Sequence, residues 1–182
     1  MWSPAAHTRG IPTTGRQEQH TMSDAVARFR DAWAHQRPDL DLSSMETIGR
    51  VRRLASLMNT ITDDHLADSD LTRPEFEVLS ALRRSPQGLR PRQLTRATLS
   101  SGAATTKRLI RLETAGLITR TPLQPHRREV QVQLTPQGRD LIDRLYPTQL
   151  DREAAVLAPL TPDERTQLAD LLRRVLTPID PA

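Results

Sequence analysis

The sequence predicts a mostly helical chain with a small β-wing, and three observations lead to this fold class. Apolar residues recur at helical spacing through most of the 182 residues. Two short segments, at 117–121 and 129–134, follow the composition and alternation of paired strands. Residues 83–128, called the basic stretch below, carry ten arginines and one lysine against a single acid, a net charge of +10 in a chain whose total is +4. Helices followed by a β-ribbon within this stretch predict a winged helix-turn-helix.

The N-terminal region contains one expected helix after an irregular leader. The first 22 residues contain Pro, Gly, Thr, Gln and His without apolar periodicity, so we expect a disordered leader. The periodic sequence begins just after Met22, which is an alternative start of the protein. A short helix is expected from Asp24 to Gln36, where apolar residues return at helical spacing. Pro38 ends it, because proline disfavours helix in the preceding residue.

Helix-start signals place the next three elements. A capping-box pattern at residues 43–46 predicts a long helix from Ser44 to about Asp68. A second capping box begins at Thr72 and starts the following helix. Residues 85–88 read Ser-Pro-Gln-Gly and predict a turn. A short helix is then expected from Pro91 to about Ala97, directly before the most informative part of the chain.

A helix from about Ser101 to Ala115 is expected to read DNA bases. The Ser100 hydroxyl is placed to cap its first turn, and Gly116 supplies a left-handed stop. The first turns carry small or hydroxylated side chains and one lysine, which allow close approach to base edges. These candidate base-reading residues are Ser101, Gly102, Ala103, Thr105, Thr106 and Lys107. The alternative is an amphipathic surface helix whose exposed face happens to be small.

The expected wing follows this helix. Its strands are Leu117–Thr121 and Glu129–Leu134, and the second alternates apolar with polar residues. Prolines stiffen the connecting tip, and the adjacent Arg127 and Arg128 suit a narrow, electronegative minor groove. The alternative is a solvated hairpin tip, but the helix and the hairpin occur in the order of a winged helix.

Two further helices are expected after the wing. Thr135 and Pro136 start a long helix to about Leu157, which Pro147 is expected to kink or divide. The last helix starts at Thr161 and ends before Pro178. The terminal helices carry more apolar surface than a winged helix needs for its own core. We therefore expect segments 23–68 and 139–177 to dimerise around a winged helix at 72–138, the alternative being that they fold back on it.

Composition and charge narrow the function classes. The basic stretch suggests a surface for phosphate, with Arg92 and Arg96 as phosphate-binding residues. None of the five aromatic residues lies in it, which disfavours the stacking used to bind single strands. The chain has no cysteine, no apolar run of about 18 residues and no phosphate loop or nucleophile motif. Its scattered histidines lack metal-ligand spacing. We expect a cytoplasmic protein that is not an enzyme and needs no cofactor, metal or membrane.

Three runs, 99–103, 111–120 and 134–138, together with the helix order, resemble the MarR family of bacterial transcription regulators over residues 43–176. This resemblance implies a homodimer that binds a pseudo-palindromic operator in double-stranded DNA. Most such regulators are repressors that a small phenolic or anionic ligand releases. The wing departs from the family pattern, because His126, Arg127 and Arg128 stand where Asp-x-Arg is usual, and Glu129 follows where a small residue is common.

The added N-terminal helix and the break after it resemble the urate-responsive branch of this family that includes HucR- and PecS-like regulators. The resemblance implies a ligand site formed by Trp33, Glu77, Arg108 and Arg120, called the ligand quartet below. The branch has Asp at the position of Glu77. An anionic ring would stack on the tryptophan and accept hydrogen bonds from an arginine. The alternative is that Trp33 belongs to the core and Glu77 to a structural ion pair.

The sequence thus predicts a ligand-responsive, homodimeric DNA-binding regulator, with urate or a related aromatic or anionic compound as its effector. A second hypothesis is a winged helix that binds another protein and no specific DNA. That function would need an apolar patch on the expected base-reading face, where the sequence instead places hydroxyls and positive charge.

Overall fold

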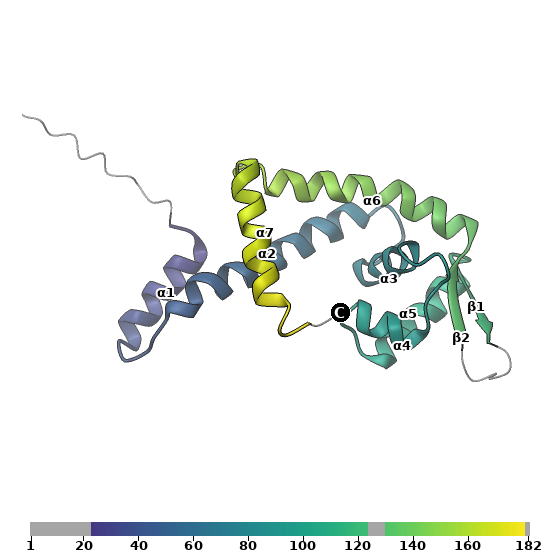
Figure 1. Ribbon diagram of the computed structural model, residues 1–182, viewed down its shortest axis with the longest axis horizontal. Helices are drawn as coiled ribbons and strands as arrows, with labels where there is room; N and C mark the ends of the chain where they lie inside the picture. The colour runs from purple at the N-terminus through teal and green to yellow at the C-terminus, as the bar shows by residue number, and fades with distance from the viewer. Residues whose placement is uncertain (1–22, 124–129, 181–182) are drawn as a thin grey trace, which may run out of the picture. The chain divides into compact units, whose positions relative to one another are not determined.

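The computed structural model describes residues 23–123 and 130–180, and Figure 1 shows its elements. The chain divides into two compact units, residues 1–53 and 54–182, with the boundary inside the second helix. The helices are α1 (Ala25–Gln36), α2 (Ser43–Leu66), α3 (Arg73–Arg83), α4 (Pro91–Ala97), α5 (Gly102–Thr114), α6 (Pro136–Val156) and α7 (Pro162–Leu176). The strands β1 (Ile118–Pro122) and β2 (Val130–Leu134) form one antiparallel pair. The mostly helical fold class with a small wing is confirmed.

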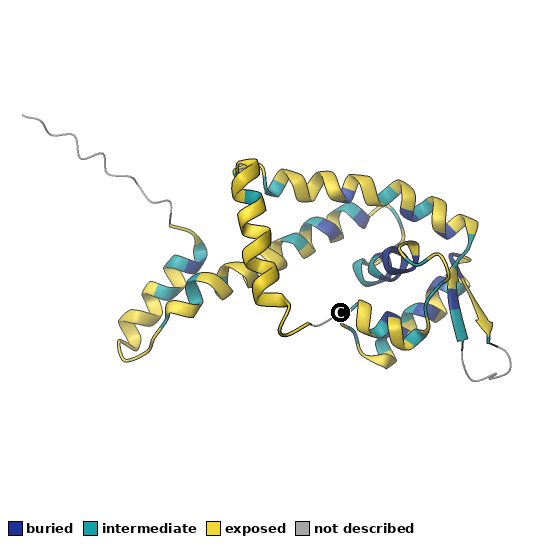
Figure 2. Cartoon of the chain, viewed as in Figure 1, coloured by how far each residue is buried: buried dark blue, intermediate teal, exposed yellow. Residues whose placement is uncertain are grey.

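The core of the second unit gathers where α3, α4, α5, α6 and the ribbon meet. Its buried side chains are densest on α3 (Figure 2), and those of α3 and α5 recur at helical spacing. The fully buried ones include Val78, Leu79, Leu94, Leu109, Leu112, Ile118, Val132 and Ile142. The helix pair α4–α5 and the ribbon are therefore mounted on a single apolar cluster, which fixes their relative placement.

The turn before α4 adds a short backbone pairing to the two-stranded ribbon. Ile118 pairs with Leu134 in the register of the two strands, and Leu89 forms an isolated antiparallel bridge to Val132. Gly88 makes this approach possible, because it has a φ of 79° and an added Cβ would collide with the Val132 carbonyl oxygen. The turn thus attaches the wing to the winged-helix core.

Several element boundaries differ from the predictions. The capping box predicted at residues 43–46 was wrong: α2 begins at Ser43, whose N–H is bound by the Asp41 carboxylate at 2.9 Å. Glu46 instead forms ion pairs with Arg30 and Arg50, within the N-terminal unit. The helix α6 passes through Pro147 without dividing. The predicted leader, residues 1–22, lies outside the described residues.

An acid on α3 holds α5 from behind. Glu75 is 3% exposed and accepts hydrogen bonds from the Thr72 hydroxyl at 2.7 Å and the Thr72 N–H at 2.9 Å. Arg111, on α5, forms an ion pair with the same carboxylate and donates to the Asp70 carbonyl at 2.8 Å. Burial raises the pKa of Glu75, but the hydrogen bonds from Thr72 and Arg111 outweigh it, so the pKa lies below its ordinary value. The carboxylate therefore stays charged and ties α5 to the start of α3.

We expect Glu75→Gln to lower the free energy of unfolding by about 1–3 kcal/mol at pH 7, because it removes charge-assisted hydrogen bonds. Because the folded-state pKa of Glu75 is depressed, its contribution to stability is fully present above the ordinary carboxyl pKa of 4.5. This contribution is lost as the pH falls through the folded-state pKa. Denaturant unfolding of both proteins between pH 7 and pH 3 measures the difference. A difference that stays constant across this range would contradict the assignment.

Candidate nucleic-acid interface and adjoining cavities

A cluster of hydroxyl groups joins α4 to α5. The Thr105 hydroxyl lies 2.9 Å from Thr95 Oγ1 and 2.7 Å from Ser100 Oγ, and it donates to the Ser101 carbonyl at 3.1 Å. Ser100 also lies 3.0 Å from Thr98 Oγ1. Buried hydroxyls with mutual hydrogen bonds hold two short helices at a defined angle more firmly than apolar contact alone. The cluster therefore fixes how α5 projects from the fold.

This cluster corrects two predictions. Thr105 was expected among the base-reading residues, but it is 1% exposed and its hydroxyl is used internally. Ser100 was expected to cap α5, but its hydroxyl joins the cluster and Ser101 is the cap, accepting from the Ala104 N–H at 3.2 Å. Thr105 and Ser100 therefore position α5 and do not belong to its exposed face.

The outer face of the first turns of α5 is open. The remaining predicted base-reading residues are all exposed: Ser101, Gly102, Ala103, Thr106 and Lys107. A Cβ added at Gly102 would meet no atom within 4 Å, so the backbone is bare at this point. The Thr106 hydroxyl donates to the Gly102 carbonyl at 2.9 Å, inside the helix. A flat partner could thus approach the helix backbone as closely as glycine and alanine allow.

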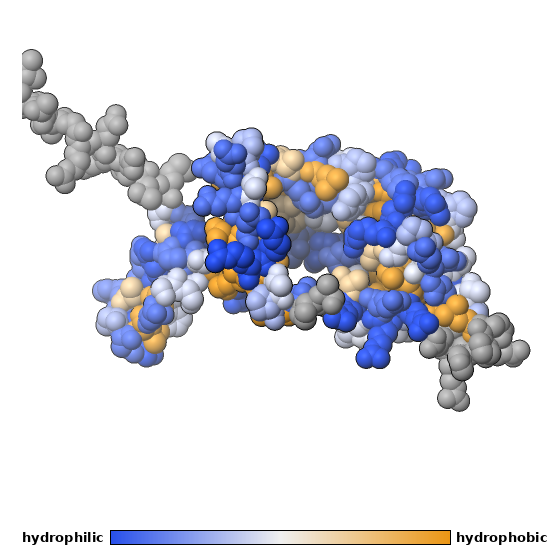
Figure 3. Space-filling model, viewed as in Figure 1, coloured by the Kyte–Doolittle hydropathy of each residue, from blue (hydrophilic) through white to orange (hydrophobic). Residues whose placement is uncertain are grey.

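Positive charge flanks this open face. Arg92 and Arg96 lie exposed on α4, and Figure 3 shows hydrophilic side chains over this part of the molecule. Across the described ranges, neither Arg92 nor Lys107 forms an ion pair, so both cations are available to an outside anion. The predicted wing-tip residues Arg127 and Arg128, with His126, lie outside the described residues. Unpaired cations around a small, polar helix face suit the phosphates on either side of a groove.

An ion pair ties the first strand of the wing to α5. Arg120 Nε, on β1, donates to Glu113 Oε2 on α5 at 2.8 Å. The hydrogen bond from Arg120 holds the pKa of Glu113 below its usual value, and Glu113 raises that of Arg120. Both groups are therefore charged at neutral pH, and the wing and α5 are joined outside the apolar core as well as within it.

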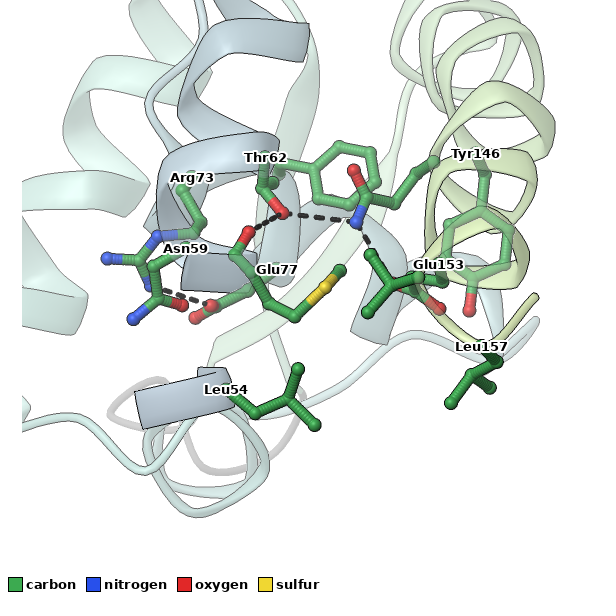
Figure 4. Close-up of a pocket in the computed structure, with 12 residues that line it drawn as sticks. Leu54, Asn59, Thr62, Arg73, Glu77, Tyr146, Glu153 and Leu157 are labelled. Carbon is green, nitrogen blue, oxygen red and sulfur yellow. Dashed lines mark hydrogen bonds and ion pairs between the residues drawn. The ribbon is translucent and has the colours of Figure 1, made fainter. Parts of the chain in front are cut away.

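A cavity of about 360 Å³ lies between α2, α3 and α6, and Glu77 and Arg73 line it (Figure 4). Arg73 Nη1 donates to Glu77 Oε1 at 3.3 Å, a long contact. On α6, Gln149 is 3% exposed and donates to Thr62 Oγ1 and to Glu153 Oε1, each at 3.0 Å. The remaining walls are largely apolar, formed by Leu54, Met58, Phe76, Tyr146, Val156 and Leu157. Such a cavity has the size and lining of a small-molecule site.

Among the described residues, no hydrogen bond or ion pair joins two members of the ligand quartet. Trp33 is 51% exposed on α1, in the N-terminal unit, and is not a core residue of that unit. In the second unit Glu77 forms its ion pair with Arg73, and Arg120 forms its own with Glu113. Arg108 is half-buried on α5. Arg73 is not among the residues that the sequence predicts for this site, although its position four residues before Glu77 on one helix indicates a pair.

The described residues contain neither a group of three potential metal ligands nor a helix long and apolar enough to cross a membrane.

Comparison with known proteins identifies the class of protein to which the chain belongs. A model described as MarR family matches residues 69–129. The HTH-type transcriptional regulator PecS of Dickeya dadantii (strain 3937) is 37% identical over 156 residues, which cover 85% of this chain and 92% of the relative. The chain therefore belongs to the MarR family of DNA-binding transcriptional regulators.

Solved structures agree with this assignment. BpsR of Bordetella bronchiseptica, whose DNA binding is regulated by 6-hydroxynicotinic acid, is 28% identical with a TM-score of 0.65, over 71% of this chain and 98% of that one. The S. aureus MepR–DNA complex superimposes with a TM-score of 0.66 at 22% identity, over 72% and 96% of the two chains. The second likeness concerns the fold alone.

We expect Gly102→Ala to leave the thermal unfolding temperature unchanged or slightly higher, because the new methyl group meets no protein atom. The same methyl group stands where base edges approach α5, so DNA affinity is expected to fall by about 1–3 kcal/mol. Thermal melts and fluorescence anisotropy on operator DNA measure the two effects. Equal affinity of the variant and the wild type would show that this face does not approach the bases.

Proposed function

We propose that the protein is a homodimeric, sequence-specific repressor that binds a pseudo-palindromic operator in double-stranded DNA and is released by a small aromatic or anionic effector. The open first turns of α5 are the single observation that carries the DNA-binding part. Apart from Lys107 their exposed residues are small or hydroxylated, a bare glycine begins the helix, and the unpaired Arg92 lies on the neighbouring α4. These are the properties of a helix that enters the major groove.

The proposed contacts divide into two kinds. The residues Ser101, Gly102, Ala103, Thr106 and Lys107 would face base edges, while Arg92 and Arg96 would bind phosphates. Arg127 and Arg128 would reach the minor groove from the wing. The second candidate function, a protein-binding adaptor, receives less support because the first turns of α5 expose polar and small side chains and no apolar patch. Ile110, which is 52% exposed, lies further along the helix.

The test is a titration of the full-length protein against the DNA upstream of its own coding region, with a scrambled duplex for comparison. Arg92→Ala should weaken binding and lower the slope of log affinity against log salt by about one, because one phosphate-binding cation is lost. The control is Arg144→Ala, which removes an exposed arginine of α6 outside the basic stretch. A flat slope of log affinity against log salt for the wild type would favour the adaptor.

Repeating the titration with urate tests the ligand quartet, since urate is expected to reverse DNA binding.

The C-terminal helix supports the homodimer. None of the described residues of α7 is buried, and Figure 2 shows it exposed along its length. Its apolar residues nevertheless fall on one face, at Leu168, Leu171, Leu172, Val175 and Leu176, and Ile179 continues the row. The helix α2 has a similar exposed row at Ile48, Val51, Leu54 and Leu57. Exposed apolar rows of this length suit a symmetric interface with a second copy of the chain.

We expect Leu171→Asp to convert the dimer into a monomer, because a charge would be buried against apolar partners. Operator affinity should fall with it, since one protomer contacts only one half-site. Light scattering after size-exclusion chromatography gives the oligomeric state. Thr166→Asp, on the opposite face of α7, should remain dimeric. A monomeric wild type, or a dimeric Leu171→Asp variant, would contradict the role of α7.

The effector part of the proposal rests on the cavity beside Glu77 and on the likeness to BpsR. An anionic ring that stacks on Trp33 and takes an arginine from its acidic partner would favour a different position of α5. It would release DNA only if it binds the two positions with different affinity. In the described residues, the long Arg73–Glu77 contact is a pair that a competing anion could open.

A further inference from the structure

Ile110 is an apolar residue of α5 that lies outside the core-facing row of its helix. The buried residues of α5 are Thr105, Leu109 and Leu112, and both leucines belong to the apolar cluster of the second unit. Ile110 follows Leu109 directly, which turns its side chain about 100° away from that row. It is 52% exposed. The core therefore does not require an apolar side chain at this position.

Ile110 continues the exposed face that begins at the first turn of α5. It follows Ala103 by seven residues and Lys107 by three, and all three residues are exposed. Seven residues of helix span roughly 10 Å at a rise of about 1.5 Å each. This length corresponds to about three base-pair steps of about 3.4 Å in B-DNA. The face that is proposed to meet base edges therefore extends by one turn, as far as Ile110.

The acid beside Ile110 on α5 is neutralised within the protein. Glu113 lies three residues further along the helix, and its carboxylate accepts a hydrogen bond from Arg120 Nε at 2.8 Å. Without a partner, this carboxylate would repel the phosphates that border a groove. Because Arg120 compensates its charge, the third turn of α5 can approach a strand of phosphates beside Ile110.

The side chain at this position favours one of the four bases. Isoleucine neither donates nor accepts a hydrogen bond, so it does not pair with the polar groups of base edges. In the major groove thymine presents a C5 methyl group, whereas cytosine presents an amino group. Contact between two apolar groups removes both from water, whereas an amino group covered by isoleucine would lose its hydrogen bond to water. Ile110 is therefore suited to thymine.

We propose that Ile110 is a specificity-determining residue that contacts the C5 methyl group of a thymine in each operator half-site. This inference rests on the proposed function, because it assigns a base to the face of α5 that is proposed to enter the major groove. It adds one apolar contact to the polar base-reading residues of the first two turns. A protein partner that covered Ile110 instead would make no difference between thymine and a base without the methyl group.

The experiment replaces thymine with uracil in an operator duplex located by footprinting upstream of the coding region. Uracil differs from thymine only by the missing C5 methyl group. Each thymine is replaced in turn, together with its symmetry mate, and fluorescence anisotropy gives the affinity of the full-length protein. At one position the wild type should bind the uracil duplex about fourfold more weakly per half-site, the factor for one buried methyl group. Ile110→Ala should bind both forms of that duplex equally.

Two further variants serve as controls for this ratio of affinities. Ile110→Val keeps a branched apolar side chain and should retain part of the preference for thymine. Leu150→Ala removes a side chain of similar exposure, 47%, from α6 and should retain the whole preference. Thermal melts establish that each variant is folded, as expected for substitutions at exposed positions.

The proposal is overturned if the wild type and Ile110→Ala respond alike to every uracil substitution, or if the wild type responds to none. A scrambled duplex, measured with the same samples, separates this result from the proposed function. Equal affinity of the wild type for operator and scrambled DNA would refute the proposed function and the thymine contact with it. Specific operator binding with an unaltered uracil profile in Ile110→Ala would refute the contact alone.

Discussion

The placement of α5 depends on the buried hydroxyl of Thr105. Its neighbours Thr95 and Ser100 are polar as well, and each of these hydroxyls sits within hydrogen-bond distance of Thr105. An apolar contact tolerates sliding, but a set of hydrogen bonds of 2.7–2.9 Å has one arrangement that satisfies it. The open face of α5, the cations of α4 and the wing all take their positions from this joint and from the Glu75–Arg111 pair behind it.

The arginines of the winged helix divide into two groups with different physical roles. Arg83, Arg111 and Arg120 form ion pairs with acids from other parts of the fold. Their charge is neutralised there and holds the elements together. Arg84 and Arg92 have no such acid among the described residues. A basic composition alone does not separate these groups. The unpaired ones are those whose field extends into solvent, where a phosphate or a carboxylate can meet it.

Local signals in the sequence were sufficient for most of the fold. The capping box at Thr72, the caps at Thr135 and Thr161 and the left-handed Gly116 depend on neighbouring residues only, and each is present in the structure. Burial of Thr105 could not be predicted in the same way. A small polar residue at a helix start gives the same sequence pattern whether it faces DNA or a neighbouring helix. The pairing state of Arg84 likewise depends on tertiary placement that no periodicity records.

The lack of buried residues in α7 has a consequence for how the protein behaves with concentration. A helix with no buried residue gains little from its own protomer, so its order in a homodimer would be governed by mass action. The melting temperature would then rise with protein concentration. Dilution would loosen α7 before it unfolds the winged helix, whose core is closed within one chain. The amount of regulator present would in this way set both its assembly and its resistance to proteolysis at the C-terminal end.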